Sequence, residues 1–251
     1  MDGELQGGLF SVLSSLISSF SGGGGSLILL SGLVVLFPTA GYLPALTITK
    51  VSAAILTSTS GWMHRERQEI DWRMILVLIL SGLTGVGIGT YLVQYKIDEE
   101  ILLKALPVLL FIIVIYLSFD RKRGAGKNRE KPFVPAEYIE AGVFSLFMSL
   151  LSGMVAGMGP FFVAYFVIRF HTSFIQTIAY MMISGTVITV LQSSYLLWTV
   201  DVNLTLLTLV IFGSLIGAYF GTKFQYKMGN HLVKTAALLM MSAMGLFMIF
   251  T

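Results

Sequence analysis

The chain has 251 residues, of which 55% are hydrophobic and only 12% are charged. An ordinary soluble domain carries about 25% charged residues, so this composition excludes a soluble enzyme and predicts an integral membrane protein. There is no cysteine, which excludes disulfides, thiolate metal sites and cysteine nucleophiles. The net charge of +3 does not indicate nucleic-acid binding, because six of the sixteen basic residues lie in one loop, Arg121–Lys131, between apolar runs. Such a loop is typical of the cytoplasmic side of a membrane protein.

The acidic first residues, Met1 to Glu4, precede an apolar run that no small-residue cleavage site follows. We therefore expect that this run is not a cleaved signal peptide. A helix needs about 20 apolar residues to cross the hydrocarbon core of a bilayer. Six segments meet this need, and each is predicted to be one membrane-spanning helix: 43–63, 72–95, 101–119, 174–198, 203–225 and 231–250.

Two further apolar stretches are too long for one span and are interrupted by glycine. Residues 5–37 contain Gly22-Gly23-Gly24-Gly25, and residues 139–170 contain Gly157-Met158-Gly159-Pro160. A continuous helix over the first stretch would be about 50 Å long, whereas cutting it at the glycines leaves arms of about 24 and 18 Å, each too short to cross. Runs of glycine, and proline, break helices. Each stretch is therefore predicted to form a broken, re-entrant hairpin that bends inside the membrane.

The two halves of the sequence align with an offset of about 130 to 135 residues. Gly22 and Gly24 align with Gly157 and Gly159, and the series Ser81, Gly85, Gly89 aligns with the series Gly213, Gly217, Gly221. The alignment predicts an all-α polytopic membrane protein in which each repeat is one broken hairpin plus three transmembrane helices. The predicted units are a first repeat over 1–119, a basic cytoplasmic linker over 120–138 and a second repeat over 139–251.

The charges of equivalent loops predict that the two repeats are inverted. The first loop between full spans carries Arg65, Arg67 and Arg73, whereas its counterpart around Asp201 has no basic residue, and the following pair of loops shows the reverse bias. Equivalent loops with opposite bias lie on opposite sides of a membrane. Eight full crossings in parallel repeats, the simpler alternative, would put one basic loop on the wrong side. We expect loops 64–72, 120–137 and 226–231 to be cytoplasmic and both termini to be extracytoplasmic.

The glycine bends are the first candidates for a binding site. A half-helix that begins in mid-membrane, here at Ser26 and Phe161, exposes unpaired amides and the positive end of its dipole, and such a terminus binds anions. Lys50 and Gln192 lie within predicted spans, where polar groups are candidates for function. The predicted substrate-binding residues are Gly22, Gly23, Gly24, Gly25, Ser26, Lys50, Gly157, Gly159 and Gln192.

Each of these interpretations has an alternative. The glycines could only permit close helix packing, Lys50 could extend its amine to the nearby interface, and Gln192 could hydrogen-bond a neighbouring helix. Small residues also recur every four positions, a spacing that lets helices pack closely in lipid. These packing candidates are Ser145, Ser149, Gly153, Gly157, Ser15, Ser19, Gly23, Gly213, Gly217 and Gly221.

No aspartate or glutamate lies near the middle of a predicted span. A carboxylate proton relay is therefore not expected, and proton coupling through protein groups is predicted to be weak or absent. The sequence contains no nucleophile–base pattern, no metal-binding motif and no phosphate-binding loop, so neither an enzyme nor a cofactor is predicted.

Over essentially its whole length, the chain resembles the sulfite exporter TauE/SafE family. The resemblance rests on Gly22–Gly25 before an apolar run, on Trp62-Met63-His64-Arg65 leading to Ile70-Asp71-Trp72-Arg73, on Gly157-Met158-Gly159, on Gly213, Gly217 and Gly221, and on Leu232-Val233-Lys234 before the apolar end with Gly245. Pro160 stands where the family usually has glycine. A related group that takes up thiosulfate uses cysteines, which this chain lacks.

The resemblance implies transport of small sulfur-containing anions, namely sulfite, sulfoacetate or other organosulfonates. Inverted repeats with broken helices are common in secondary transporters, so we expect a secondary transporter in the cell (inner) membrane that exports such an anion by alternating access. Its expected partners are this small anion and membrane lipid, and the sequence leaves the oligomeric state open. The alternatives are an anion channel and a non-transporting membrane assembly or receptor subunit.

Overall fold

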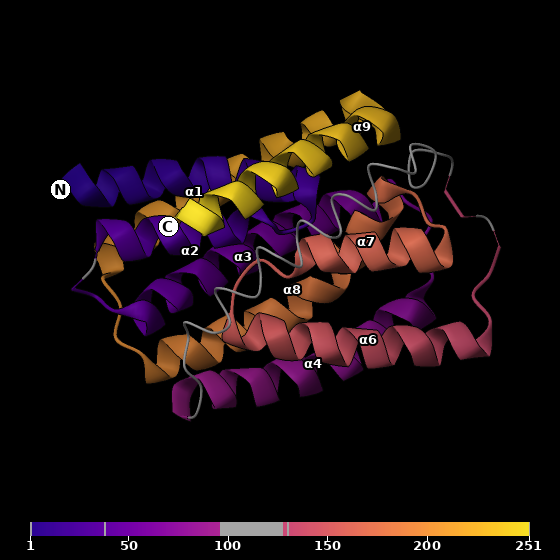
Figure 1. The fold of residues 1–251 in the computed structure, drawn as a ribbon, viewed down its shortest axis with the longest axis horizontal. Coiled ribbons are helices and arrows are strands. Elements are labelled where there is room, and N and C mark those ends of the chain that lie inside the picture. Colours follow the sequence, from indigo (N-terminus) through magenta and orange to yellow (C-terminus); the bar gives the residue numbers. More distant parts are fainter. Residues whose placement is uncertain (1, 38, 96–127, 130, 251) are drawn as a thin grey trace.

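The computed structural model describes the chain apart from residues 1, 38, 96–127, 130 and 251, and the described residues form helices and no strand. The helices are α1 (Asp2–Ser21), α2 (Gly25–Leu36), α3 (Tyr42–Arg65), α4 (Trp72–Tyr95), α6 (Pro135–Met154), α7 (Gly159–Phe170), α8 (Phe174–Thr199) and α9 (Leu204–Phe250) (Figure 1). The predicted span 101–119 lies outside the described residues, as does most of the basic loop before Asn128.

The other predicted spans agree with the structure. α3, α4 and α8 begin and end within two residues of the predicted segments. Segments 203–225 and 231–250 both lie in α9, which Gly229 interrupts with a φ of 72° and a ψ of 171°. α4, α8 and the part of α9 from Leu204 to Ala236 are long and apolar enough to cross a membrane. An all-helical chain of this kind is consistent with a multi-pass membrane protein.

α3 matches these spans in length, with 24 residues, but it is more polar. Its buried polar side chains face neighbouring helices: Ser52 shares a hydrogen bond of 2.6 Å with Ser214 of α9, and Ser60 shares one of 2.7 Å with Thr222. A helix enclosed by protein satisfies polar groups that lipid could not. Position in the bundle therefore explains why α3 is less apolar than α4 or α8.

One end of the bundle gathers the described parts of the three basic loops. His64 Nδ1 lies 2.6 Å from the hydroxyl of Tyr226, and the guanidinium of Arg67 lies 4.9 Å from the centre of the same ring. The amide of Asn128 donates to Gln68 Oε1 at 2.8 Å. Residues 64–71, 128–129, 131–134 and 226–230, called the basic end below, thus lie together, as the charge pattern predicts.

The opposite end, called the N-terminal end below, holds the start of α1 and the turn between α8 and α9. Asn203 Nδ2 donates to Glu4 Oε1 at 2.9 Å. The end of α4 is also there, since the Tyr195 hydroxyl of α8 donates to Gln94 at 3.3 Å. Gln94 and Asn128, on either side of the predicted span 101–119, therefore lie at opposite ends of the bundle.

Both glycine-rich stretches form hairpins that reverse direction inside the bundle. In the first, α2 returns antiparallel along α1, and the Ser14 hydroxyl donates to the carbonyl oxygen of Gly25 at 2.8 Å. In the second, α7 returns along α6, and the rings of Phe144 and Tyr165 stack with centroids 3.7 Å apart. The first hairpin enters from the N-terminal end and the second from the basic end (Figure 1).

The lengths of the first arms differ from the prediction. α1 has 20 residues instead of the expected 17, because the helix begins at Asp2 rather than at residue 5. It is about 30 Å long, longer than the expected arm of about 24 Å, but α1 is not among the described helices that are both long and apolar enough to cross a membrane. α1 nevertheless reverses at Gly22 after its residue Ser19 has reached Gly221 of α9.

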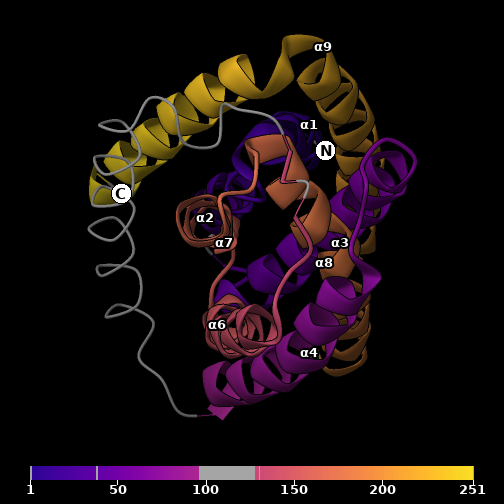
Figure 2. The same ribbon diagram turned by 90° about the vertical axis from the view of Figure 1, so that its right-hand side faces the viewer.

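Long helix pairs connect the two halves of the chain: α1 packs along α9, α6 along α4, and α3 along α8 (Figure 2). Glycine makes the first two contacts possible. A Cβ at Gly217 would overlap the carbonyl oxygen of Val12, and a Cβ at Gly89 would overlap that of Leu150. The predicted packing role of the spaced small residues is confirmed at Gly217, and Gly89, which in the sequence served only to align the two repeats, has the same role.

Replacing Gly89 by alanine tests this contact. The added methyl group must push α4 away from the α6 backbone, and such overpacking costs about 1–3 kcal/mol. We expect Gly89→Ala to lower the thermal unfolding midpoint of the detergent-solubilised protein. Gly87→Ala in the same helix is the matched control, because its Cβ would meet nothing within 4 Å. Equal midpoints for the two variants would contradict close α4–α6 packing.

Candidate functional site

The two glycine bends lie against each other in the middle of the bundle. Gly22 and Gly23 have φ values of 71° and 89°, which L side chains rarely adopt, and α2 begins two residues later at Gly25. α7 begins at Gly159, directly beside the carbonyl of Gly22, where a Cβ would overlap that oxygen. The half-helices begin one and two residues earlier than expected. Their N-termini approach each other from opposite directions (Figure 1), and the two half-helices lie between α1 and α6 (Figure 2).

A cavity of about 120 Å³ lies between these bends and the central pair α3 and α8. On the same measure a single water needs about 10–15 Å³, so the cavity has room for a small ion. The polar lining consists of Lys50 and hydroxyl side chains, and the described lining residues include no carboxylate. Its polar residues are Ser26, Thr49, Lys50, Thr57, Ser145, Ser149, Ser152, Ser184 and Thr189, and Gly22, Gly23, Gly157 and Gly159 complete the bends.

The hydroxyls of the cavity fall into two groups. Those of Thr49 and Ser184 donate to carbonyl oxygens four residues earlier in their own helices, at 2.8 Å each. The side-chain hydroxyls of Ser26 and Ser149 form no hydrogen bond within the described part of the chain. The hydroxyl of Ser152 accepts a bond from Lys50 at 3.4 Å, which leaves its own proton free. Ser26, Ser149 and Ser152 are therefore the hydroxyl donors available to a ligand.

Lys50 does not extend toward the membrane interface. Its side chain is buried, with 3% of the residue exposed. Nζ donates to the carbonyl oxygen of Ser152 and lies 3.5 Å from that of Val155, at the end of α6. These carbonyls have no partner within the helix, and they form the negative end of its dipole. Lys50 therefore occupies the wall of the cavity and binds the broken end of α6.

The amides at the start of α2 are partly engaged in local bonds. The N–H of Gly24 donates to the Ser21 hydroxyl at 3.1 Å, and the N–H groups of Ser26 and Leu27 donate to carbonyls three residues earlier. In α7, Pro160 has no N–H to offer. An incoming anion must therefore compete with local acceptors at α2, and α7 offers fewer donors than a run of glycine would.

Three of the predicted residues do not line the cavity. Gly24 and Gly25 are buried, and a Cβ at Gly25 would overlap the carbonyl oxygen of Ser14, so Gly25 serves hairpin packing. Gln192 Nε2 donates to Thr90 Oγ1 at 2.9 Å and to the carbonyl oxygen of Gly153 at 3.4 Å. It connects α8 to α4 and α6, which corresponds to the structural alternative for this residue.

The sequence alone did not identify Ser149 and Ser152 as lining residues. Ser149 was included only in the four-residue series of small residues, which predicts packing. Its position opposite Ser26 depends on how the second hairpin folds back. The described residues contain no group of three histidine, aspartate or glutamate side chains that could hold a metal ion.

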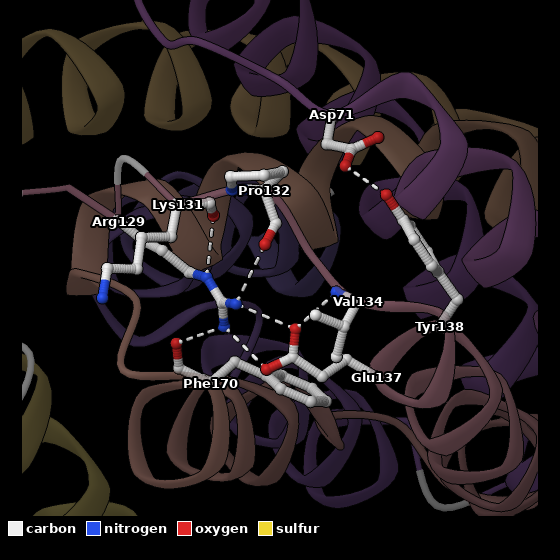
Figure 3. A network of polar contacts seen from close by, with 8 residues as sticks. All are labelled: Asp71, Arg129, Lys131, Pro132, Val134, Glu137, Tyr138 and Phe170. Carbon is white, nitrogen blue, oxygen red and sulfur yellow. Dashed lines mark hydrogen bonds and ion pairs between the residues drawn. The ribbon is translucent and has the colours of Figure 1, made fainter.

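The basic end closes over α6 and α7 through paired charges (Figure 3). Arg129 forms two bonds with the Glu137 carboxylate, at 3.0 and 2.8 Å, and donates to the carbonyl oxygen of Phe170 at 2.9 Å. Beside this pair, the Tyr138 hydroxyl donates to Asp71 at 2.6 Å. These bonds hold the ends of the second hairpin together, and they pair the charge of Arg129 with that of Glu137.

A comparison with protein families matches the family model described as Sulfite exporter TauE/SafE over residues 8–248. The comparisons with curated proteins and with solved structures return no match. The family match spans both hairpins and the cavity between them, so the resemblance predicted from the glycine motifs is confirmed. It supports transport of anionic sulfur compounds in general, and the apolar helices make this a multi-pass membrane protein. The chain belongs to the sulfite exporter TauE/SafE family.

Proposed function

We propose that this protein exports a small sulfur-containing anion, such as sulfite, sulfoacetate or another organosulfonate, across the cytoplasmic membrane by alternating access. The cavity between the glycine bends carries this proposal, because Lys50 is the one charged group among its described lining residues. Hydroxyl donors without internal partners surround the same space. A buried cation with free donors and no nearby carboxylate favours an anionic ligand.

The anion binds between the two half-helix termini in this proposal. Lys50 releases the α6 carbonyls and pairs with the anion, while Ser26 and Ser149 donate hydrogen bonds. Since Lys50 now holds the broken end of α6, its transfer to the anion also loosens the second hairpin. Binding and movement of the hairpin are coupled in this way, as alternating access requires.

Hydrogen bonds between helices support an inverted repeat. Thr57 and Thr189, 132 residues apart, share a bond of 2.9 Å between α3 and α8. The same offset of 132 residues relates Ser60 to Gln192 and Thr90 to Thr222. The bond between Ser60 and Thr222 is therefore equivalent to the bond between Gln192 and Thr90 in the other half. A pseudo-twofold axis through the α3–α8 contact accounts for both observations. Inverted repeats with broken helices near the midplane are common in secondary transporters.

Export needs no proton relay in this proposal. An inside-negative potential favours the exit of an anion by about 2.3 kcal/mol per charge per 100 mV. The described lining residues of the cavity include no carboxylate that could carry protons with the anion.

Ion flux far above carrier turnover would favour the channel alternative, and a purified chain that moves no anion would favour an assembly or receptor subunit.

Ligand binding tests the proposed substrate class and the role of Lys50 together. The purified protein is heated with sulfite, sulfoacetate, taurine or thiosulfate, since a ligand of the folded state raises its apparent stability. We expect an anion from this panel to stabilise the protein and to be exported from proteoliposomes. Lys50→Gln should weaken binding by about 10- to 100-fold, the value of a hydrogen bond to a charged group. Lys131→Gln, on the exposed surface, is the control. Unchanged affinity in Lys50→Gln would contradict the site.

A pair of serines tests which hydroxyls contact the ligand. Ser149 lines the cavity without an internal partner, whereas the Ser184 hydroxyl in the same lining donates to Tyr180. We expect Ser149→Ala to reduce anion affinity by up to about tenfold, and Ser184→Ala to leave it nearly unchanged. Both are measured by ligand-dependent thermal shift. A larger effect of Ser184→Ala would mean that the anion binds elsewhere in the cavity.

The absence of native cysteine permits a test of orientation. Single cysteines are introduced at Arg67, Lys227 and Asp201, which are exposed at the two ends of the bundle. With the basic end in the cytoplasm, a membrane-impermeant maleimide should label Asp201→Cys in intact cells, and the other two only after permeabilisation. Labelling of Arg67→Cys and Lys227→Cys from different sides would contradict the proposed arrangement.

A further inference from the structure

A second hollow lies on the outer surface of the bundle, between α3 and the first part of α9. This groove has a volume of about 660 Å³ and is lined by Ser58, Thr59, Trp62, Leu215, Ile216, Tyr219 and Phe220. Its volume is within the range of about 300–1,000 Å³ found for small-molecule sites. It is separate from the cavity at the glycine bends, since the two share no lining residue.

Basic residues stand where the groove reaches the basic end. Lys223 and Lys227 continue the helical face that carries Ile216 and Phe220, and Lys223 Nζ lies 5.7 Å from the centre of the Tyr219 ring. Arg65 continues the same face of α3, one turn after Trp62. All three cations are exposed, and none has a carboxylate partner among the described residues. They differ in this from Arg129 and Arg169, whose charges are paired within the protein.

Two hydroxyls on the groove floor also have no partner. The side-chain hydroxyls of Ser58 and Thr59 form no hydrogen bond within the described part of the chain, although the hydroxyl of Thr57 beside them donates to the carbonyl oxygen of Ala53. The C-terminal part of α9 turns at Gly229 and leads to the side of the bundle away from α3 and α8, so it does not cover the groove (Figure 2).

We propose that this groove binds one anionic phospholipid. An acyl chain lies along the apolar walls of α3 and α9, Ser58 and Thr59 donate to the ester oxygens, and the phosphate lies among Arg65, Lys223 and Lys227. The apolar walls of the groove match the acyl chain of such a lipid, and its cationic end matches the phosphate. Basic residues beside membrane-spanning helices bind anionic head groups. A zwitterionic lipid fills the same groove but gains no net charge attraction.

Trp62 reports directly on the occupant, because it lines the groove. A chain with Trp72→Phe and Trp198→Phe keeps Trp62 as its single tryptophan, since the protein has three. This protein is reconstituted with phosphatidylglycerol or phosphatidylcholine brominated on the acyl chains. We expect the apparent association constant from Trp62 quenching to be at least about fivefold higher for brominated phosphatidylglycerol than for brominated phosphatidylcholine. A factor of about five is the effect of one basic residue near a membrane surface.

Charge variants separate a specific site from general attraction. Lys223→Gln with Lys227→Gln should remove most of the preference, and Lys223→Arg with Lys227→Arg should keep it. Arg73→Gln with Lys131→Gln removes two exposed charges from the same end and should leave the preference intact. A chain with Trp198 alone, exposed at the N-terminal end, should show no preference. Equal quenching of Trp62 by the two lipids, or equal loss in both glutamine pairs, would overturn the proposal.

Discussion

In hydrocarbon, a backbone amide or carbonyl without a partner costs several kcal/mol, so a helix broken inside the membrane must find partners for its ends. The two hairpins solve this problem differently. At the first bend, serines of α1 supply the hydrogen-bond partners. The Ser18 carbonyl oxygen accepts a bond from the N–H of Gly23, and the Ser21 hydroxyl accepts one from the N–H of Gly24. At the second, Lys50 of α3 donates to the carbonyls at the end of α6.

This difference gives Lys50 a structural role together with its proposed function. The ammonium group is held in the wall of the cavity by carbonyls that need a donor, so it is in place before an anion arrives. In the proposed mechanism, transfer of Lys50 from these carbonyl oxygens to an anion changes what holds α6 in place, so that one side chain couples ligand binding to hairpin movement.

Close approach of helices is the second condition for the site. The half-helix termini meet because Gly22 and Gly159 have no side chains between them, and the hairpins keep this position because glycines of α4 and α9 admit the backbones of α6 and α1. Paired charges and stacked rings then hold the outer ends of the second hairpin, where Arg129 binds Glu137 and Phe170.

The sequence by itself determined the helical class, the positions of the described full spans and the two breaks, because length, apolarity and consecutive glycines act locally. It also indicated that the basic loops share one end, since charge asymmetry is read directly from composition. Only the tertiary structure decided which polar groups face the cavity. Ser149 and Gln192 both lie in helices that pack against neighbours, and the rotation of each helix about its axis places Ser149 in the cavity wall and Gln192 against Thr90. That rotation is set by contacts between residues far apart in the chain, which the local pattern of one sequence does not contain.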